Sequence, residues 1–263
     1  MPAKPTTPVS MTQTLPDDTA PYARPGARIP ALDIARTGAL AAMVLFHFVF
    51  DLEMFGHVPR GTATTGIWRA LAVATAGSFL CLAGMGLWLA HGTGIRWPAF
   101  WRRFAKVAGA AGLVSIGTYI AFPHAFVFFG ILHSIALCSL LGLLALRLPV
   151  LAIAGLAVVV FYVPEFARSS AFDAPYWWWT GLQTRPLSTV DYEPIFPWFA
   201  PFLAGVAVSK FATQMGLWAR LSTPAPSRVI HLAGLPGRHS LLIYLIHQPI
   251  LIGLVWGVTQ LMR

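Results

Sequence analysis

The 263-residue chain is 57% hydrophobic and only 10% charged, and its mean hydropathy is +0.68. A soluble domain carries about 25% charged residues, so this composition excludes a protein whose whole surface faces water. The net charge is +9. Because the basic residues gather between apolar runs instead of forming a stripe on one module, we expect no nucleic-acid partner and a lipid bilayer as the surrounding medium.

The chain begins with a Pro/Thr-rich stretch, residues 1–29, which we expect to be a disordered cytoplasmic tail. Residues 30–263 are expected to form one transmembrane domain. A span needs about 20 apolar helical residues, and strand-like alternation is missing. The sequence therefore predicts an all-α, polytopic transmembrane helical bundle with about seven spans. In chain order they are residues 32–55, 67–90, 104–122, 128–146, 150–163, 195–211 and 240–261, the fifth being short.

The distribution of lysine and arginine sets the predicted orientation. If the N-terminus is cytoplasmic, thirteen of the 18 basic residues fall on the inner side and the other five on the outer side. The positive-inside rule then favours an N-in topology, and an odd number of helices places the C-terminus outside. The basic segment after the sixth helix is inside only if the short fifth segment spans.

The first span holds three ionisable residues in a suggestive register. Arg36 and His47 are eleven residues apart, which places them on one helical face about 16 Å apart along the axis. Asp51 follows His47 by four residues on the same face. Since ionisable groups are costly in hydrocarbon, we interpret His47 as a general base oriented by a hydrogen bond to Asp51. The alternative is a purely structural polar pair.

Basic residues at the predicted cytoplasmic face are candidates for binding a phosphorylated acyl carrier. Arg36 is the first, although it is also placed to pair with Asp33 three residues earlier. Arg102 and Arg103 are further candidates for nucleotide phosphates, with Lys106 nearby. The plainer interpretation of all of them is an ordinary positive-inside flank.

Other polar and aromatic residues in or near the spans are candidate cavity residues. His133 and His247 lie within apolar runs, and Gln248 follows His247 directly, ahead of Pro249. Trp178 belongs to an aromatic run in the longest outer loop, which is either an interfacial belt or a platform for an acceptor. Glycines such as Gly84 and Gly117 are expected to allow close helix packing. No ligand spacing typical of a metal site is present, so no metal is predicted.

At these residues the sequence resembles known membrane acyltransferases. The LD-x-x-R start and the R-x10-H spacing of the first span resemble those of acyltransferase-3-type enzymes. The string ALDIARTGALAAMVLFHFVFDLEMFG more closely resembles the heparan-alpha-glucosaminide N-acetyltransferase catalytic-domain family. Three later strings are similar to that family as well, so the resemblance runs from about residue 28 to about residue 262: FGILHSIALCSLLGL, DYEPIFPWFAPFLAGVAV and GRHSLLIYLIHQPIL.

The resemblance implies an acetyltransferase of the bacterial inner membrane. It would take the acetyl group of cytoplasmic acetyl-CoA, or a related acyl-CoA, and deliver it to an amino or hydroxyl group of a glycan or envelope acceptor. By analogy Arg36 would contact CoA phosphate and His47 would be the catalytic histidine. In the lysosomal branch the proposed active histidine lies just after the first helix, where His57 is the nearest match. The resemblance leaves both histidines as candidates, and leaves the oligomeric state open.

A second function class also fits buried histidine and aspartate. Such residues form proton relays in transporters and channels, so a proton-coupled transporter is the alternative. The sequence lacks an inverted repeat with paired broken helices, which favours the enzyme.

Overall fold

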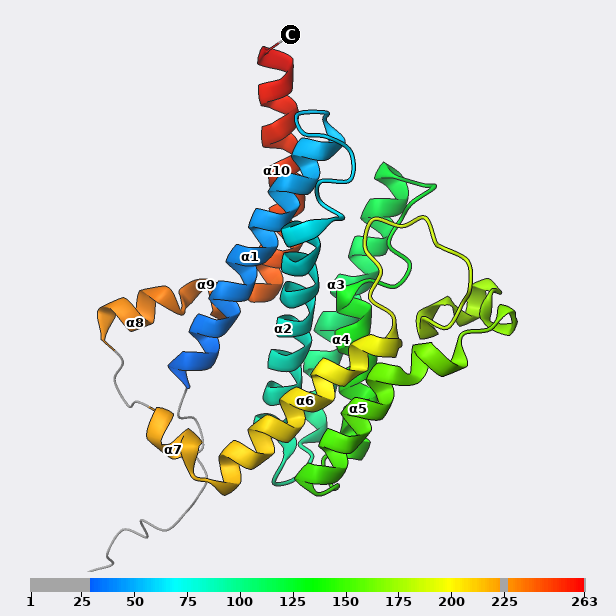
Figure 1. Ribbon diagram of the computed structural model, residues 1–263. Helices are drawn as coiled ribbons and strands as arrows, with labels where there is room; N and C mark the ends of the chain where they lie inside the picture. The colour runs from blue at the N-terminus through cyan, green and yellow to red at the C-terminus, as the bar shows by residue number, and fades with distance from the viewer. Residues whose placement is uncertain (1–28, 223–226, 263) are drawn as a thin grey trace, which may run out of the picture.

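Seven apolar helices correspond to the seven predicted segments (Figure 1). The computed structural model describes residues 29–222 and 227–262, so the predicted tail lies outside the described residues except for Ile29. The apolar helices are α1 (Pro30–Met54), α2 (Gly66–His91), α3 (Trp97–Ala121), α4 (Ile131–Ala145), α5 (Val150–Ala167), α6 (Ile195–Gln214) and α10 (Ser240–Leu261). All but α4 are long and apolar enough to span a bilayer.

The short helix is α4 and not α5, contrary to the sequence prediction. α5 has 18 residues, whereas α4 has 15. At 1.5 Å per residue α4 covers only about 22 Å. The chain before it, residues 122–130, returns from the end of α3 into the bundle without forming a helix. Non-helical backbone is tolerated at this depth only where protein or a cavity surrounds it.

The centre of the bundle is the contact between α2 and α6. A side-chain carbon at Gly84 would overlap the carbonyl of Phe202, and one at Gly205 would overlap the backbone of Cys81. The two helices can therefore approach this closely only because glycine stands at both crossing points. α5 and α4 pack on the other sides of α6, and the buried core includes Leu80, Leu87, Cys138, Ile153, Phe202 and Val206.

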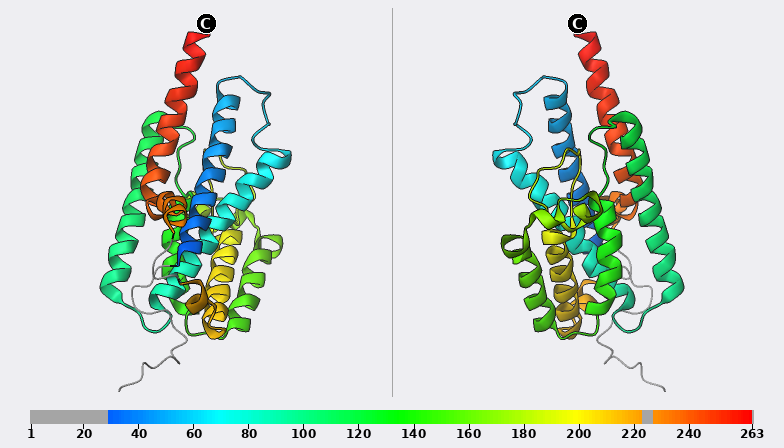
Figure 2. Two further views of the ribbon diagram at one scale, coloured as in Figure 1. Left: turned by 90° about the vertical axis from the view of Figure 1, so that its left-hand side faces the viewer. Right: turned by 90° about the vertical axis from the view of Figure 1, so that its right-hand side faces the viewer.

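α1 and α10 form a second pair at the side of this core, and α3 packs mainly on α4. Figure 2 shows α1 and α10 running toward the same end of the molecule, where the final turns of α10 project beyond the rest. The described chain thus ends at one extreme of the bundle, whereas α1 begins part-way along it (Figures 1 and 2). Of the glycines expected to mediate packing, Gly117 on α3 faces open space.

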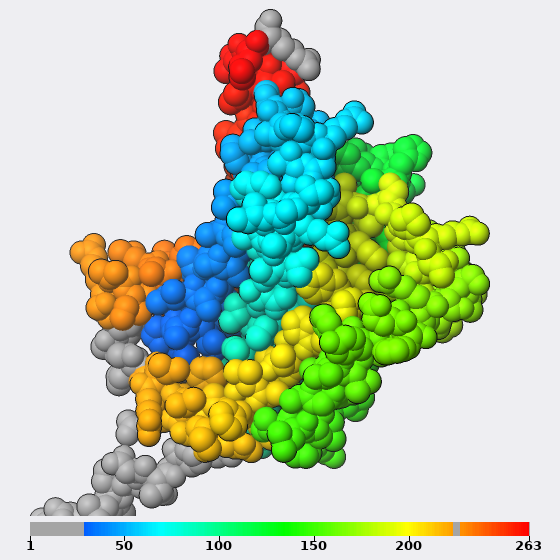
Figure 3. All heavy atoms as spheres, in the orientation of Figure 1, coloured from blue at the N-terminus to red at the C-terminus, as the bar shows by residue number. Residues whose placement is uncertain are grey.

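Short helices that the sequence did not predict fill the connections. They are η1 (Ser170–Phe172), η2 (Pro175–Thr180), α7 (Leu217–Leu221), α8 (Arg228–Ala233) and α9 (Leu235–Arg238). α8 and α9 form a projection beside α1 (Figure 3). Arg238 of α9 pairs with Asp33 of α1 at 3.2 Å, and the backbone N–H of Gly237 donates to the Thr37 hydroxyl at 3.0 Å. These contacts fix the start of α10 against the start of α1.

Candidate functional site

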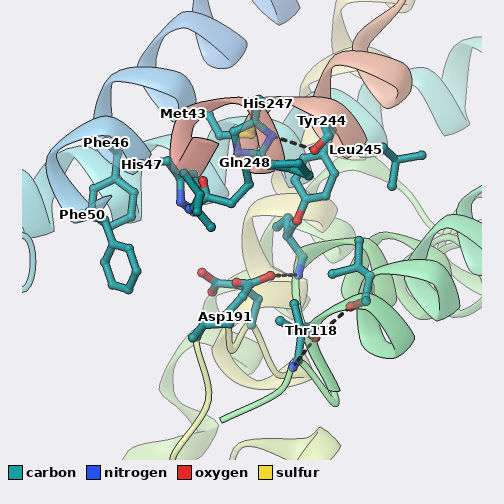
Figure 4. Close-up of a pocket in the computed structure, with 18 of the residues that line it drawn as sticks. Met43, Phe46, His47, Phe50, Thr118, Asp191, Tyr244, Leu245, His247 and Gln248 are labelled. Carbon is teal, nitrogen blue, oxygen red and sulfur yellow. Dashed lines mark hydrogen bonds between the residues drawn. The ribbon is translucent and has the colours of Figure 1, made fainter. Parts of the chain in front are cut away.

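A cavity of about 760 Å³ lies between α1, α2, α3 and α10. Two non-helical loops, around Val127 and around residues 190–193, form another part of its wall. Its walls are mostly apolar, but polar groups from distant parts of the chain meet in it, including His47, Thr75, Asp191, Glu193, His247 and Gln248. Figure 4 shows Asp191 across the cavity from His47 and His247.

Two histidines lie side by side in this cavity. The ring centroids of His47 on α1 and His247 on α10 are 4.9 Å apart. His247 Nδ1 is 2.6 Å from the carbonyl oxygen of Tyr244, which can only accept, so Nδ1 carries the proton. The other ring nitrogen of His247, Nε2, therefore presents a lone pair. Among the residues that the structure describes, this buried atom has no hydrogen-bond partner, and neither has His47 Nδ1.

The expected hydrogen bond between Asp51 and His47 does not form. Asp51 is fully buried, and its Oδ1 accepts from Gln248 Nε2 at 2.7 Å. The four-residue spacing does place both side chains on one face of α1, but α10 packs against that face and supplies Gln248. The predicted pairing is therefore wrong: Asp51 accepts a hydrogen bond from Gln248 instead of from His47. The histidine whose ring is oriented by a hydrogen bond is His247, through the backbone carbonyl of Tyr244.

Buried polar atoms without a hydrogen-bond partner are concentrated at this one place. Within the described part of the chain they are His47 Nδ1, Asp51 Oδ2, Thr75 Oγ1, Glu193 Oε2, His247 Nε2 and Gln248 Oε1. All belong to the cavity wall except Asp51, which is bonded to a wall residue. An unpaired buried polar group costs about 1–3 kcal/mol. Such a cluster is therefore typical of a site that is completed by a ligand or water.

Asp191 and Glu193, two acidic residues that were not among the predicted site residues, line the same cavity as the histidines. Their loop pairs with the chain before α4: Val190 N donates to Ala125 O at 2.9 Å, and Glu193 N donates to Phe129 O at 3.1 Å. Asp191 Oδ2 also accepts from the backbone N–H of Ile131 at 3.1 Å. The acidic residues of DYEP were a usable signal, because the chain has only nine acidic residues in all.

Burial changes the ionisation of this acidic pair. Burial raises the pKa of Asp191 to about 6, although the hydrogen bond from Ile131 opposes the shift. Burial also raises the pKa of Glu193 well above its usual range, and the adjacent Asp191 carboxyl adds to the effect. At neutral pH Asp191 is therefore mainly ionised, and Glu193 holds its proton to a higher pH than an exposed glutamate does. Neighbouring carboxyl groups that differ in protonation can serve as hydrogen-bond acceptor and donor.

A smaller cationic cavity of about 240 Å³ adjoins the first. Arg36, Arg103 and Lys106 line it, together with Ser240. Asp33 holds Arg36 at 3.2 Å, as the sequence suggested, but it also holds Arg238. Phe79, Ile131 and Tyr244 line both cavities and thus form the wall between them. Arg102 lines neither cavity.

The remaining sequence-predicted residues lie outside the large cavity. His57 Nε2 is 2.7 Å from Thr259 Oγ1, so it tethers the loop after α1 to the end of α10. His133 accepts from the backbone N–H of Gly130 and lies 3.3 Å from Ser115 Oγ, which supports the turn before α4. Trp178 packs on Phe128, with ring centroids 5.3 Å apart, and its carbonyl accepts from Tyr192, a wall residue. Their predicted roles in binding or catalysis stay predictions.

The side chains present do not resemble a metal centre. Among residues 29–222 and 227–262, no group of three or more His, Cys, Asp or Glu lies close enough to hold an ion. The polar side chains of the large cavity are instead proton donors and acceptors, and the smaller cavity beside it is lined by cations.

The fold and the cavity define an integral membrane protein of the polytopic helical class, with a buried polar site between its first and last long helices. Comparison with known families is specific. The chain belongs to the heparan-alpha-glucosaminide N-acetyltransferase catalytic family, whose model matches residues 28–249. It is therefore a membrane acetyltransferase by family, and that family in general takes its acetyl group from acetyl-CoA. No curated protein and no solved structure matches the chain.

Proposed function

We propose that this protein transfers an acetyl group from cytoplasmic acetyl-CoA to an amino or hydroxyl group of an extracytoplasmic glycan or envelope acceptor, in the inner membrane of a bacterium. The observation that carries the proposal is the adjacency of two cavities of different chemistry. One presents three cations and the other presents two histidines and two carboxyls, with Tyr244 in the wall between them.

The cationic cavity suits the phosphates of the donor. Arg36 and Arg103 can each offer two parallel N–H groups to a phosphate, and Lys106 adds a further charge. The pantetheine arm would then extend past Tyr244 toward the histidines. This arrangement separates donor binding from the reacting atoms, as the Arg36 to His47 register along α1 predicts.

The large cavity suits the transfer step. His247 Nε2 or His47 takes the proton from the acceptor N–H or O–H as the acceptor attacks the thioester carbonyl. A new C–N or C–O bond forms and the C–S bond breaks. The same proton then passes to the leaving sulfur, which departs as the free thiol of CoA. Asp191 is placed to accept a hydrogen bond from the acceptor, and Glu193 to donate one.

Donor binding and thiol release together test this function. Acetyl-CoA should raise the unfolding temperature of the purified protein, because a ligand that binds only the folded state stabilises it. Free CoA thiol should accumulate when membrane extract is added as the acceptor source. If acetyl-CoA neither stabilises the protein nor loses its acetyl group, the proposal is wrong. A proton-coupled transporter would give that negative result.

A further inference from the structure

We infer that the acceptor is an amphipathic lipid, which enters the large cavity sideways from the bilayer and presents its amino or hydroxyl head group to the histidines. This inference rests on the proposed function and names its acceptor class. The inference is drawn from the apolar part of the cavity wall, which has no role in the proposed transfer step.

The polar atoms occupy only part of the cavity wall. From His47 toward the end of α1, the wall side chains are Phe50 and Met54, both apolar. α3 contributes Leu113, Val114, Gly117 and Ala121, and its one polar lining residue, Thr118, has its hydroxyl bonded to the backbone of Val114 and Val127. A ligand that fills this space therefore needs an apolar portion as well as a polar end.

The apolar part of the wall reaches the outer surface within the spans. Leu113, well inside α3, is 63% exposed although it lines the cavity, whereas Met54, another lining residue, is the last residue of α1. Pro249 on α10 is exposed as well, and α10 touches α3 only sparingly. Exposed residues in the middle of spanning helices face lipid. The cavity thus opens toward the bilayer between α3 and α10.

The chemistry of this opening discriminates between acceptors. Its rim residues Leu113, Gly117 and Pro249 carry no charge. A water-soluble glycan would have to leave its hydration shell to cross such a rim, at a cost for every unpaired hydroxyl group. A lipid can keep its chain in the apolar part while its head group meets the unpaired atoms of His47 and His247.

Glycine positions offer a matched pair of variants. Gly117 on α3 and Gly155 on α5 are both exposed helical glycines, and an added side chain at either would meet only open space. Gly117→Leu fills the apolar part of the cavity, whereas Gly155→Leu adds the same bulk to a lipid-facing surface away from it. Leu113→Trp and Leu151→Trp form a second pair of the same design.

The experiment supplies acetyl-CoA labelled in its acetyl group to membranes that contain each full-length variant. Labelled products are then divided between organic solvent and water. We expect label in the organic phase, a loss of about tenfold in Gly117→Leu from overfilling the cavity, and no comparable loss in Gly155→Leu. Stabilisation of Gly117→Leu by acetyl-CoA shows that this variant is folded with its donor site intact.

Two results would overturn the inference in distinguishable ways. If label is transferred only to water-soluble products, and Gly117→Leu behaves like Gly155→Leu, the lipid acceptor is wrong while the acetyltransferase function stands. If no label is transferred above membranes that lack the protein, the proposed function fails and the inference fails with it.

Discussion

His47 on the first long helix and His247 on the last lie with their imidazole centroids 4.9 Å apart. Each ring has a buried nitrogen without a hydrogen-bond partner in the described part of the chain, and of the two only His247 has its proton position fixed by a backbone carbonyl. In this pair, Nε2 of His247 is a defined proton acceptor, whereas the proton position of His47 is not fixed. Such a pair can take a proton from the acetyl acceptor and return it to the leaving group.

Replacing either histidine of this pair should remove most of the activity. General acid–base catalysis contributes about 10²–10⁴-fold, so His247→Ala and His47→Ala should each lower kcat by about 100-fold or more. The rate of CoA thiol release in proteoliposomes measures the effect. His124→Ala is the matched control, because His124 lies exposed in the loop after α3 and lines neither cavity.

His57→Ala separates the two histidine assignments that the sequence left open. Because His57 contacts Thr259 and lies outside the cavity wall, its loss should affect stability more than kcat. A kcat loss in His57→Ala as large as that in His47→Ala, with normal thermal stability, would move the reacting site to the loop after α1.

Replacing the basic residues should affect the KM for acetyl-CoA only where the residue lines the cationic cavity. Arg36→Ala and Arg103→Ala should each raise the KM for acetyl-CoA about tenfold, since a charge-assisted hydrogen bond contributes about 1.5–3 kcal/mol. Arg102→Ala should change KM little, because Arg102 lines neither cavity. Initial rates over a range of acetyl-CoA concentrations give the comparison. Equal effects at all three positions would indicate general electrostatic attraction at the cytoplasmic face.

The buried Asp51–Gln248 hydrogen bond should be a determinant of stability. Gln248→Leu leaves Oδ1 of a fully buried carboxylate without its donor, at a cost of about 1–3 kcal/mol or more. Asp51→Asn keeps an oxygen that accepts the same bond, so it should cost much less. Thermal unfolding in one detergent measures both. If Asp51→Asn is the more damaging variant, the negative charge itself is needed.

Asp191 should make the folded state more stable in mild acid than at neutral pH. Its pKa is raised to about 6 by burial, so the folded protein holds this proton more tightly than the unfolded chain. The contribution is complete below about pH 4 and is lost as the pH rises through about 6. Asp191→Asn should abolish this part of the pH dependence of the unfolding temperature. An unchanged pH dependence in Asp191→Asn would show that another group is responsible.

The crossing of α2 and α6 should tolerate no side chain at its contact points. Gly84→Ala places a carbon against the carbonyl of Phe202, so the helices must separate. Gly77→Ala, on the same helix, meets open space and is the control. The yield of monodisperse protein in size-exclusion chromatography should fall for Gly84→Ala alone.

The sequence by itself determined the helices and the kind of protein. Span-length apolar runs admit only helices in lipid, so α1, α2, α6 and α10 begin and end within a few residues of their predicted limits. Four strings in order were enough to indicate the family that the comparison then showed. α4 was predicted too long, because apolar composition does not distinguish a helix from a buried non-helical return such as residues 122–130. α5 was predicted too short, because the helix continues through Pro164 to Ala167.

Only the tertiary structure decided which polar groups meet. The spacing of His47 and Asp51 fixes a shared helical face but does not determine the hydrogen-bond partner of either side chain. The partner of Asp51 is Gln248, which lies 197 residues later in the chain. Asp191 and Glu193 reach the cavity through backbone pairing between two loops, which leaves no periodic pattern in either segment. The helical periodicity of a segment predicts only the direction in which each side chain points from its helix. The contacts between distant segments, which set hydrogen bonds and ionisation, exist only after the helices pack.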